Sequence, residues 1–145
     1  MADDGVVEVS VHIAASPETV FPYFTDPGRY AQWMGSGATL EPVPGGTYRI
    51  RMRGGVEAVG EFVEITPPHR LVFTWGWTHD PAVPPGATRV VITLHPEGGG
   101  TRVVLRHHDL PGQQQRDHHA KGWELYFSRL GSVLAGHDPG EDPNT

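Results

Sequence analysis

The sequence predicts an α+β fold, in which a curved antiparallel sheet of six or seven strands packs against one long C-terminal helix, with two short helices near the N-terminus. Two observations predict this fold. Apolar residues alternate with polar ones in seven segments, which are separated by turns rich in the chain's 19 Gly and 14 Pro residues. From about residue 113, apolar residues instead recur every three or four positions, as on one face of a helix. Strands joined by tight turns pair antiparallel, and only the last helix is long enough to cover their apolar face.

The N-terminal part is expected to hold one strand and two short helices. The strand covers residues 6–13, where valine and isoleucine alternate with polar residues. Ser16 is a suitable N-cap and Pro17 suits the first helical position, which predicts a helix over residues 17–24. A second short helix is expected over residues 26–33 by the same kind of start.

Six more strands are expected in the middle of the chain. They lie at about residues 38–41, 48–52, 56–65, 71–77, 88–94 and 102–108. The third of them breaks the alternation, because Phe62, Val63 and Ile65 do not share one parity. This irregularity indicates a β-bulge, in which one extra residue bends the strand.

The C-terminal helix is expected to run from about Gln113 to near Gly136. Its inward stripe comprises Arg116, His119, Trp123, Phe127, Leu130 and Leu134. Residues 1–136 are therefore expected to form one domain. Residues 137–145, which include two Pro and three acidic residues, are expected to pack against nothing and to be disordered.

Composition excludes several classes of function. The chain has no Cys, which excludes disulfides, a thiol nucleophile and Cys-based zinc or iron–sulfur sites. The formal net charge is −6, and the one basic cluster, Arg49, Arg51 and Arg53, alternates along a strand as a solvated face would, so no nucleic-acid partner is expected. No segment approaches the ~18 apolar residues of a membrane span, and the acidic N-terminus lacks the basic region of a signal peptide, so a cytoplasmic location is expected.

The residues expected to face inward include many large aromatic and polar-tipped side chains. They are Tyr48, Phe73, Trp75, Trp77, His107, His119, Trp123 and Tyr126. Because buried indole, phenol and imidazole groups need hydrogen-bond partners, such a cluster is typical either of a ligand cavity or of a core whose polar tips reach the rim. The pattern alone leaves both interpretations open.

His107 and His119 are expected to meet, because strand parity turns the first inward and helical spacing turns the second toward it. They could be structural histidines, hydrogen-bond donors or a general acid/base pair. No metal or other cofactor is expected, because two histidines fall short of the three protein ligands of catalytic zinc. No catalytic residue is predicted. If the protein does transfer a proton, His107 and His119 are the candidates. Nucleophile-elbow, Walker A and dinucleotide-binding motifs are all absent from the sequence.

Longer motifs resemble the Hsp 90 ATPase activator homologue branch of the START-like SRPBCC superfamily. The resemblance extends over about residues 6–135 and is carried by Glu18 to Trp33, Pro44 to Tyr48, Gly60 to Trp75, Thr101 to His107 and His119 to Leu130. It implies a helix-grip fold with a deep, mostly apolar cavity between sheet and helix, which binds a hydrophobic small molecule such as a lipid or a polyketide. The residues expected to contact that molecule are Phe24, Trp33, Tyr48, Ile50, Phe62, Phe73, Trp75, Trp77, Leu105, His107, His119, Trp123, Tyr126 and Phe127.

A smaller set of motifs is similar to a sub-branch that includes antibiotic self-resistance proteins of enediyne producers. These motifs are Trp75-Gly76-Trp77, Pro84-Pro85-Gly86 and His119…Gly122-Trp123. The similarity implies sequestration of, or resistance to, a large aromatic natural product.

Three functions follow as hypotheses. The first is a non-catalytic binder of a hydrophobic or aromatic small molecule. The second is a polyketide cyclase or aromatase in which His107 or His119 moves protons. The third is stimulation of a chaperone ATPase, ranked lowest because the chain is a single domain without the additional chaperone-binding domain of eukaryotic activators. A monomer or weak homodimer is expected, and a lid function of the loop over residues 80–87 stays open.

Overall fold

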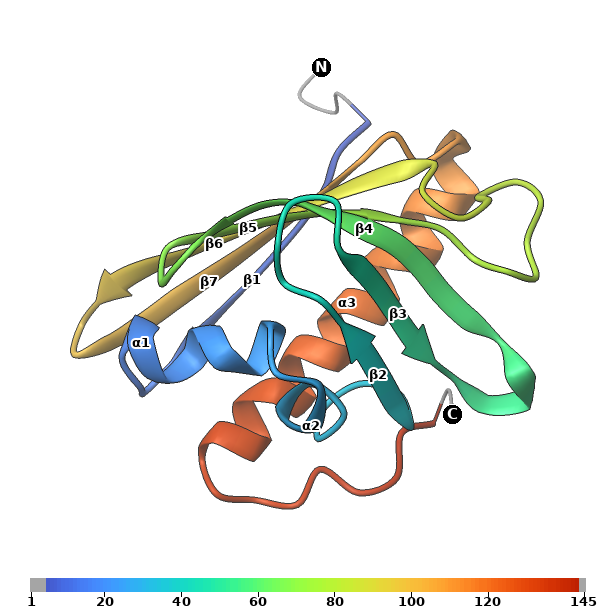
Figure 1. Cartoon of the computed structure of the whole chain (residues 1–145). Coiled ribbons are helices and arrows are strands. Elements are labelled where there is room, and N and C mark those ends of the chain that lie inside the picture. The colour runs from blue at the N-terminus through green and yellow to red at the C-terminus, as the bar shows by residue number, and fades with distance from the viewer. Residues whose placement is uncertain (1–4, 144–145) are drawn as a thin grey trace.

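A computed structural model describes residues 5–143 and shows one long helix lying across the concave face of a curved sheet (Figure 1). The elements follow in the order β1 (Val7–Ile13), α1 (Pro17–Val20), η1 (Phe21–Phe24), α2 (Pro27–Tyr30), β2 (Gly37–Leu40), β3 (Thr47–Arg51), η2 (Arg53–Gly55), β4 (Glu57–Thr66), β5 (Arg70–Trp75), β6 (Thr88–Glu97), β7 (Gly100–His108) and α3 (Gly112–Leu134). The predicted α+β class, with its sheet, long helix and short helices, is confirmed.

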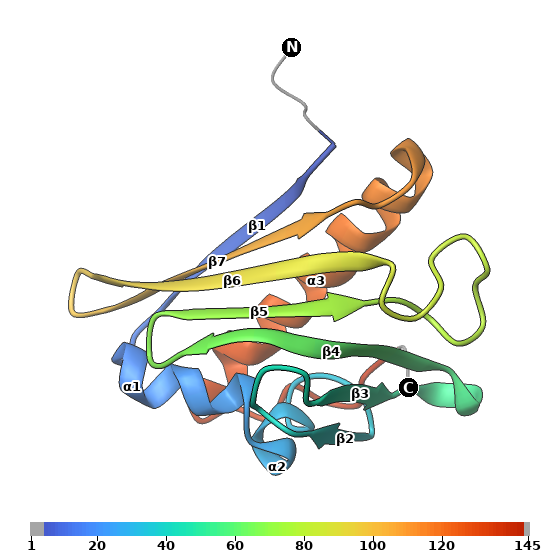
Figure 2. The same cartoon turned by 45° about the horizontal axis from the view of Figure 1, so that its top comes forward.

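The sheet has seven antiparallel strands in the order β1-β7-β6-β5-β4-β3-β2 (Figure 2). Neighbours in the sequence are thus neighbours in the sheet, and only β1 crosses over to pair with β7. The expected bulge is present in β4, where the register with β5 shifts between Phe62 and Glu64. The shift turns Phe62 into the core and leaves Val63 exposed.

The short helices begin at the predicted caps. The Ser16 hydroxyl accepts from the backbone N–H of Thr19 at 3.2 Å, and the Asp26 carboxylate accepts from that of Arg29 at 2.9 Å. The helix expected over residues 17–24 tightens into a 3₁₀ turn after Val20. Because these helices close one end of the sheet, they bring Phe24 into the core beside α3.

The inner face of α3 is close to the predicted stripe. His119, Trp123, Phe127 and Leu130 are buried, while Arg116 at its first turns is half-buried. No helix among residues 5–143 is long and apolar enough to cross a membrane.

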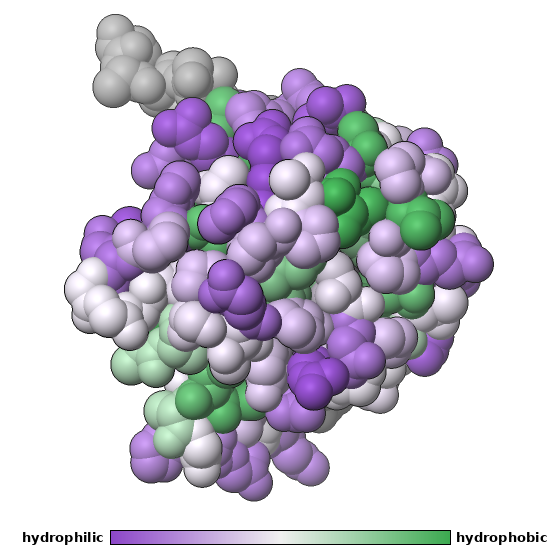
Figure 3. Space-filling model, turned by 60° about the vertical axis from the view of Figure 1, so that its left-hand side comes forward, coloured by the Kyte–Doolittle hydropathy of each residue, from purple (hydrophilic) through white to green (hydrophobic). Residues whose placement is uncertain are grey.

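The outer surface is mixed in character, with small separate apolar areas on the face seen in Figure 3. Among the described large hydrophobic residues, only Val43 and Val63 are exposed. The large apolar residues in the described part of the chain are therefore mostly buried or half-buried.

The segment after α3 packs against the domain, so the expectation of an unpacked tail is wrong for residues 137–143. The Arg129 guanidinium donates to the carbonyls of Pro139, Gly140 and Glu141 at 3.0–3.2 Å. Asp142 is 5% exposed. Its carboxylate accepts from the Tyr126 hydroxyl at 2.9 Å and from a backbone N–H in the loop after α2. These partners are not visible in the composition of the tail, and residues 144–145 lie outside the described part.

Candidate functional site

A pocket of about 400 Å³ opens between the first half of α3 and the end of the sheet where β5 finishes. One wall is α3, the second is β5 with the loop that follows it, and the third comes from the loop after α2 and the segment after β3. The residues that line it are Met34, Met52, Val56, Trp75, Trp77, His79, Asp80, His118, His119, Lys121, Gly122, Trp123, Leu125 and Tyr126. In Figure 1 this end of the molecule lies on the opposite side from α1.

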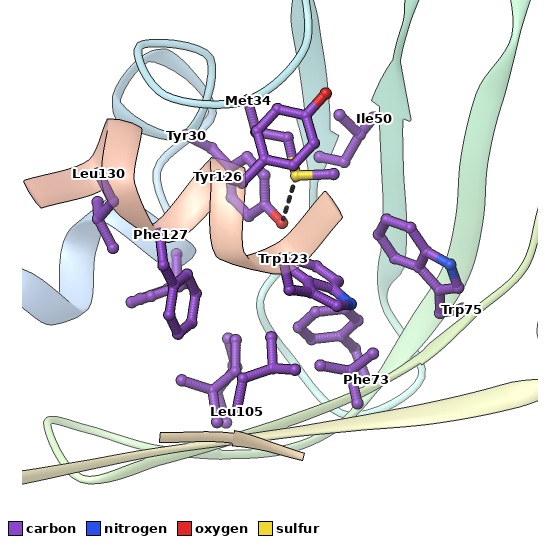
Figure 4. Close-up of a cluster of buried hydrophobic side chains, with 14 of the residues drawn as sticks. Tyr30, Met34, Ile50, Phe73, Trp75, Leu105, Trp123, Tyr126, Phe127 and Leu130 are labelled. Atoms are coloured by element: carbon purple, nitrogen blue, oxygen red, sulfur yellow. Dashed lines mark hydrogen bonds between the residues drawn. The ribbon is translucent and has the colours of Figure 1, made fainter. Parts of the chain in front are cut away.

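Three tryptophans form the aromatic part of the apolar wall. The ring centroids of Trp75 and Trp77 are 5.1 Å apart at 83°, an edge-to-face contact. Those of Trp75 and Trp123 are also 5.1 Å apart, at 52°. Trp75 and Trp123 come from facing elements, β5 and α3; Figure 4 shows Trp123 near the centre and Trp75 to its right. Such contacts between rings fix their relative orientation and make the wall rigid.

The imidazole of His119 is held between the wall and its own helix. Its Nε2 accepts the indole N–H of Trp77 at 3.0 Å, so its Nδ1 carries the proton and donates to the carbonyl of Gln115 at 2.8 Å. Burial lowers the pKa of His119 below the usual value of an imidazole. His119 is therefore neutral at pH 7, and both of its ring nitrogens are engaged.

His107 forms the matching pair with Trp123, deeper in the interior. Its Nδ1 accepts the indole N–H of Trp123 at 3.1 Å. The Thr88 hydroxyl donates to the carbonyl of Trp75 at 2.7 Å, so it accepts the proton on His107 Nε2 at 2.8 Å. His107 is fully buried, and that burial lowers its pKa well below the usual value. It too is neutral, with both nitrogens engaged.

The two histidines meet as predicted, with ring centroids 5.2 Å apart at 84°. In the structure each imidazole accepts an indole N–H, from Trp77 at His119 and from Trp123 at His107. The sequence patterns did not predict these pairs. Neither ring offers a free lone pair or a free N–H to the pocket, so the arrangement positions tryptophans and does not favour proton transfer. Among residues 5–143, no three His, Cys, Asp or Glu side chains are grouped so that they could hold a metal ion.

Charged groups lie only at the rim of the pocket, where Asp80 and Lys121 are found. The Asp80 carboxylate accepts from the backbone N–H of Ala82 at 2.9 Å and from the Gln115 amide at 3.1 Å. These hydrogen bonds hold the pKa of Asp80 below its usual range. The bond to Gln115 ties the loop after β5 to α3 and fixes the width of the entrance.

Five of the fourteen residues expected to contact a ligand line this pocket, and they are Trp75, Trp77, His119, Trp123 and Tyr126. The other nine lie in the interior away from it, and they are Phe24, Trp33, Tyr48, Ile50, Phe62, Phe73, Leu105, His107 and Phe127. Tyr48 stacks on Phe73 with centroids 4.0 Å apart, and its hydroxyl is hydrogen-bonded to that of Tyr30. Side chains thus fill the region where a deep cavity was expected.

Several pocket residues were missed by sequence reasoning. Met34 and Val56 lie in irregular segments, where periodicity carries no information about facing. Gly122 carried a usable signal, because glycine inside a helix is unfavourable and so indicates a reason for the missing side chain. A Cβ built on Gly122 has nothing within 4 Å, which shows that its absence leaves open space in the pocket.

A family model and a solved structure both relate the chain to the same protein family. The family model described as activator of Hsp90 ATPase homolog 1-like protein matches residues 14–135. An AHSA1-like protein from Rhizobium etli is 45% identical, with a TM-score of 0.76, and the match covers 95% of this chain and 86% of that one. No curated protein matches the chain at comparable significance.

Two further solved structures are similar. DynU16, a protein in the dynemicin biosynthetic locus, is 27% identical with a TM-score of 0.82, and the match covers 96% of this chain. The chain spans about half of DynU16, since 51% of that protein is covered. CalU16 from Micromonospora echinospora is 25% identical with a TM-score of 0.74, and the match covers 90% of this chain and 76% of CalU16.

Proposed function

We propose, from the premise that the chain belongs to the activator of Hsp90 ATPase homolog 1-like family, that it binds a hydrophobic, aromatic small molecule in the pocket beside α3. The observation that carries the proposal is the wall of three indole rings, Trp75, Trp77 and Trp123, around about 400 Å³. Ligand pockets are typically of this size, apolar in the middle, with a few polar groups that set orientation.

The likeness to DynU16 supports a polyketide-like natural product as the ligand. DynU16 is a protein in the dynemicin biosynthetic locus, and its match covers nearly all of this chain. Flat aromatic rings suit a wall built from indoles, because stacked and edge-to-face ring contacts add to the burial of apolar surface. The role that we propose is sequestration of such a compound, which would give resistance to it.

The alternative of a cyclase or aromatase is less well supported. It needs His107 or His119 to give or take a proton, and each of these rings already has both nitrogens in hydrogen bonds to the protein. Stimulation of a chaperone ATPase stays a prediction from the family name, which a pull-down of the chaperone with the purified chain tests.

Two glycines in α3 provide a matched test of the pocket. Gly122 lines the pocket and Gly131 does not, yet both lie inside the helix and neither has an atom within 4 Å of a built Cβ. Replacing either glycine should raise the stability of the free protein by about 1 kcal/mol, because glycine is a poor helix former. Only Gly122→Leu places a side chain in the pocket.

The measurement is the melting temperature with and without a panel of aromatic polyketides and lipids. A ligand at 100 times its Kd stabilises the fold by about 2.7 kcal/mol, which is roughly 5–10 °C in a chain of this size. We expect that shift in the wild type and in Gly131→Leu, and little of it in Gly122→Leu. No shift with any compound in the wild type, or an equal shift in both variants, would contradict the proposal.

A further inference from the structure

Among the described residues that line the pocket, the indole N–H of Trp75 is the one buried side-chain donor whose partner the protein does not supply. Trp75 lines the pocket and is only 1% exposed. Its Nε1 is one of two buried side-chain nitrogen or oxygen atoms in residues 5–143 without a hydrogen-bond partner. The other, Nε of Arg116, does not belong to the pocket. Buried polar groups are nearly always paired, so this donor calls for an explanation.

The other two indoles of the wall and its phenol already have hydrogen-bond partners. Trp77 and Trp123 donate their indole N–H groups to His119 and His107. The Tyr126 hydroxyl donates to Asp142. Of the three indoles in the wall, two are therefore paired with a histidine, and Trp75 alone keeps its donor free.

The position of Trp75 at the junction of the wall suits it for contact with a ligand. Its ring lies 5.1 Å from both Trp77 and Trp123, measured between centroids. In Figure 4 its nitrogen is on the edge of the ring that points away from Trp123. Because an indole N–H donates in the plane of its ring and cannot accept, its partner has to be an atom with a lone pair, such as a ligand oxygen or a water molecule that the ligand displaces.

We propose that the Trp75 N–H is the specificity-determining donor of the pocket, and that the ligand is an aromatic compound with a carbonyl oxygen on its ring system, as in a quinone. This inference rests on the proposed function and names the class of ligand. At the Trp75 edge the pocket wall supplies a donor, and the acceptor nitrogen of His119 is occupied by the Trp77 N–H, so a ligand that offers only donors is disfavoured beside Trp75. A site built to pair one polar group discriminates strongly against analogues that lack the partner.

The test compares two soluble probes with the same three fused rings, anthraquinone sulfonate with carbonyl oxygens and anthracene sulfonate without them. Calorimetric titration gives the ratio of their affinities for the wild type, for Trp75→Phe and for Trp77→Phe. The intrinsic difference between the two probes is the same for every protein, so it drops out when the affinity ratio of a variant is compared with that of the wild type. In Trp75→Phe the preference for the carbonyl probe should fall roughly tenfold relative to the wild type. Trp77→Phe is the matched control, because it removes similar ring area and an N–H that is committed to His119, so it should weaken both probes equally.

A second measurement uses the wild type alone, so it does not depend on whether a variant folds. The chain has four tryptophans, so its ¹H–¹⁵N correlation spectrum should show four indole N–H resonances. The Trp75 resonance should move to lower field with anthraquinone sulfonate and not with anthracene sulfonate. Equal binding of the two probes with an unmoved Trp75 resonance overturns this inference and leaves the proposed function standing. If neither probe nor any compound of the panel binds the wild type, the proposed function itself fails.

Discussion

Acidification should destabilise the fold through the neutral, buried imidazole of His107. Burial lowers the pKa of His107 well below the usual 6.5, and nearby His119 and His108 lower it further by like charge. Below about pH 6.5, the unfolded chain binds a proton at this position that the folded chain does not. The unfolded state then holds more protons, so the free energy of unfolding decreases as the pH decreases. The stabilisation is complete above pH 6.5 and is lost progressively below it.

The expected size of the effect follows from linkage. Each imidazole that stays neutral in the folded state contributes a slope of about 1.4 kcal/mol per pH unit below its unfolded pKa. Between pH 6.5 and about pH 5, His107 therefore contributes a loss of about 2 kcal/mol. His119 acts in the same direction, because burial lowers its pKa as well. Such a loss is a large fraction of the 5–15 kcal/mol that is usual for a folded domain.

The assay is urea unfolding followed by tryptophan fluorescence at several values between about pH 5 and pH 7.5, for the wild type and His107→Gln. The variant replaces the rigid imidazole that accepts from the Trp123 N–H with a longer, flexible amide, and the poorer hydrogen bond should cost about 1–3 kcal/mol at pH 7.5. It has no proton to gain, so its curve should be flatter and should approach that of the wild type near pH 5. His95→Gln, at an exposed position of β6, is the control and should keep the wild-type slope. Parallel curves for His107→Gln and the wild type would refute the neutral, buried state of His107.

Two further substitutions test the packing around the site. Asp142→Ala removes the acceptor of the buried Tyr126 hydroxyl, so it should lower the free energy of unfolding in urea by about 1–3 kcal/mol; an unchanged midpoint would show that the segment after α3 does not hold the domain closed. Gly60→Ala would place a Cβ 1.8 Å from the Thr74 carbonyl oxygen in the adjacent strand. Overpacking of this kind costs about 1–3 kcal/mol, so Gly60→Ala should lower the melting temperature by at least a few degrees. A melting temperature equal to that of the wild type would show that β4 and β5 do not approach so closely.

Much of the fold could be predicted because burial direction is periodic in this chain. Strand parity alone identified Val90, Ile92 and Leu94 as one buried face of β6, and all three are buried. The loss of parity at Phe62 likewise located the bulge in β4. These are local properties, because a strand or a helix has a fixed angular step from one side chain to the next.

The site was harder to predict because its organisation depends on partners that are distant in the sequence. Strand parity placed His107, and helical spacing placed His119, on inner faces, but these patterns could not show which indole each imidazole accepts from. The Trp77 and His119 pair is separated by 42 positions, and both residues could equally have lined an open cavity. The packing of the tail depends in the same way on Arg129, whose buried side chain reaches carbonyl groups 10–12 residues away.

The hydrogen bonds between indoles and histidines also explain how a core this rich in tryptophan can present a pocket. An indole at a pocket that is held by neither packing nor a hydrogen bond can change rotamer, and ordering it on binding would weaken the affinity. The bonds from Trp77 to His119 and from Trp123 to His107 fix two of the rings before any ligand arrives. The neutral state of both histidines is required for this, because a protonated imidazole has no lone pair to accept the indole N–H. Acidification should therefore loosen the pocket wall as well as the fold, and affinity for an aromatic ligand should decrease over the same pH range as stability.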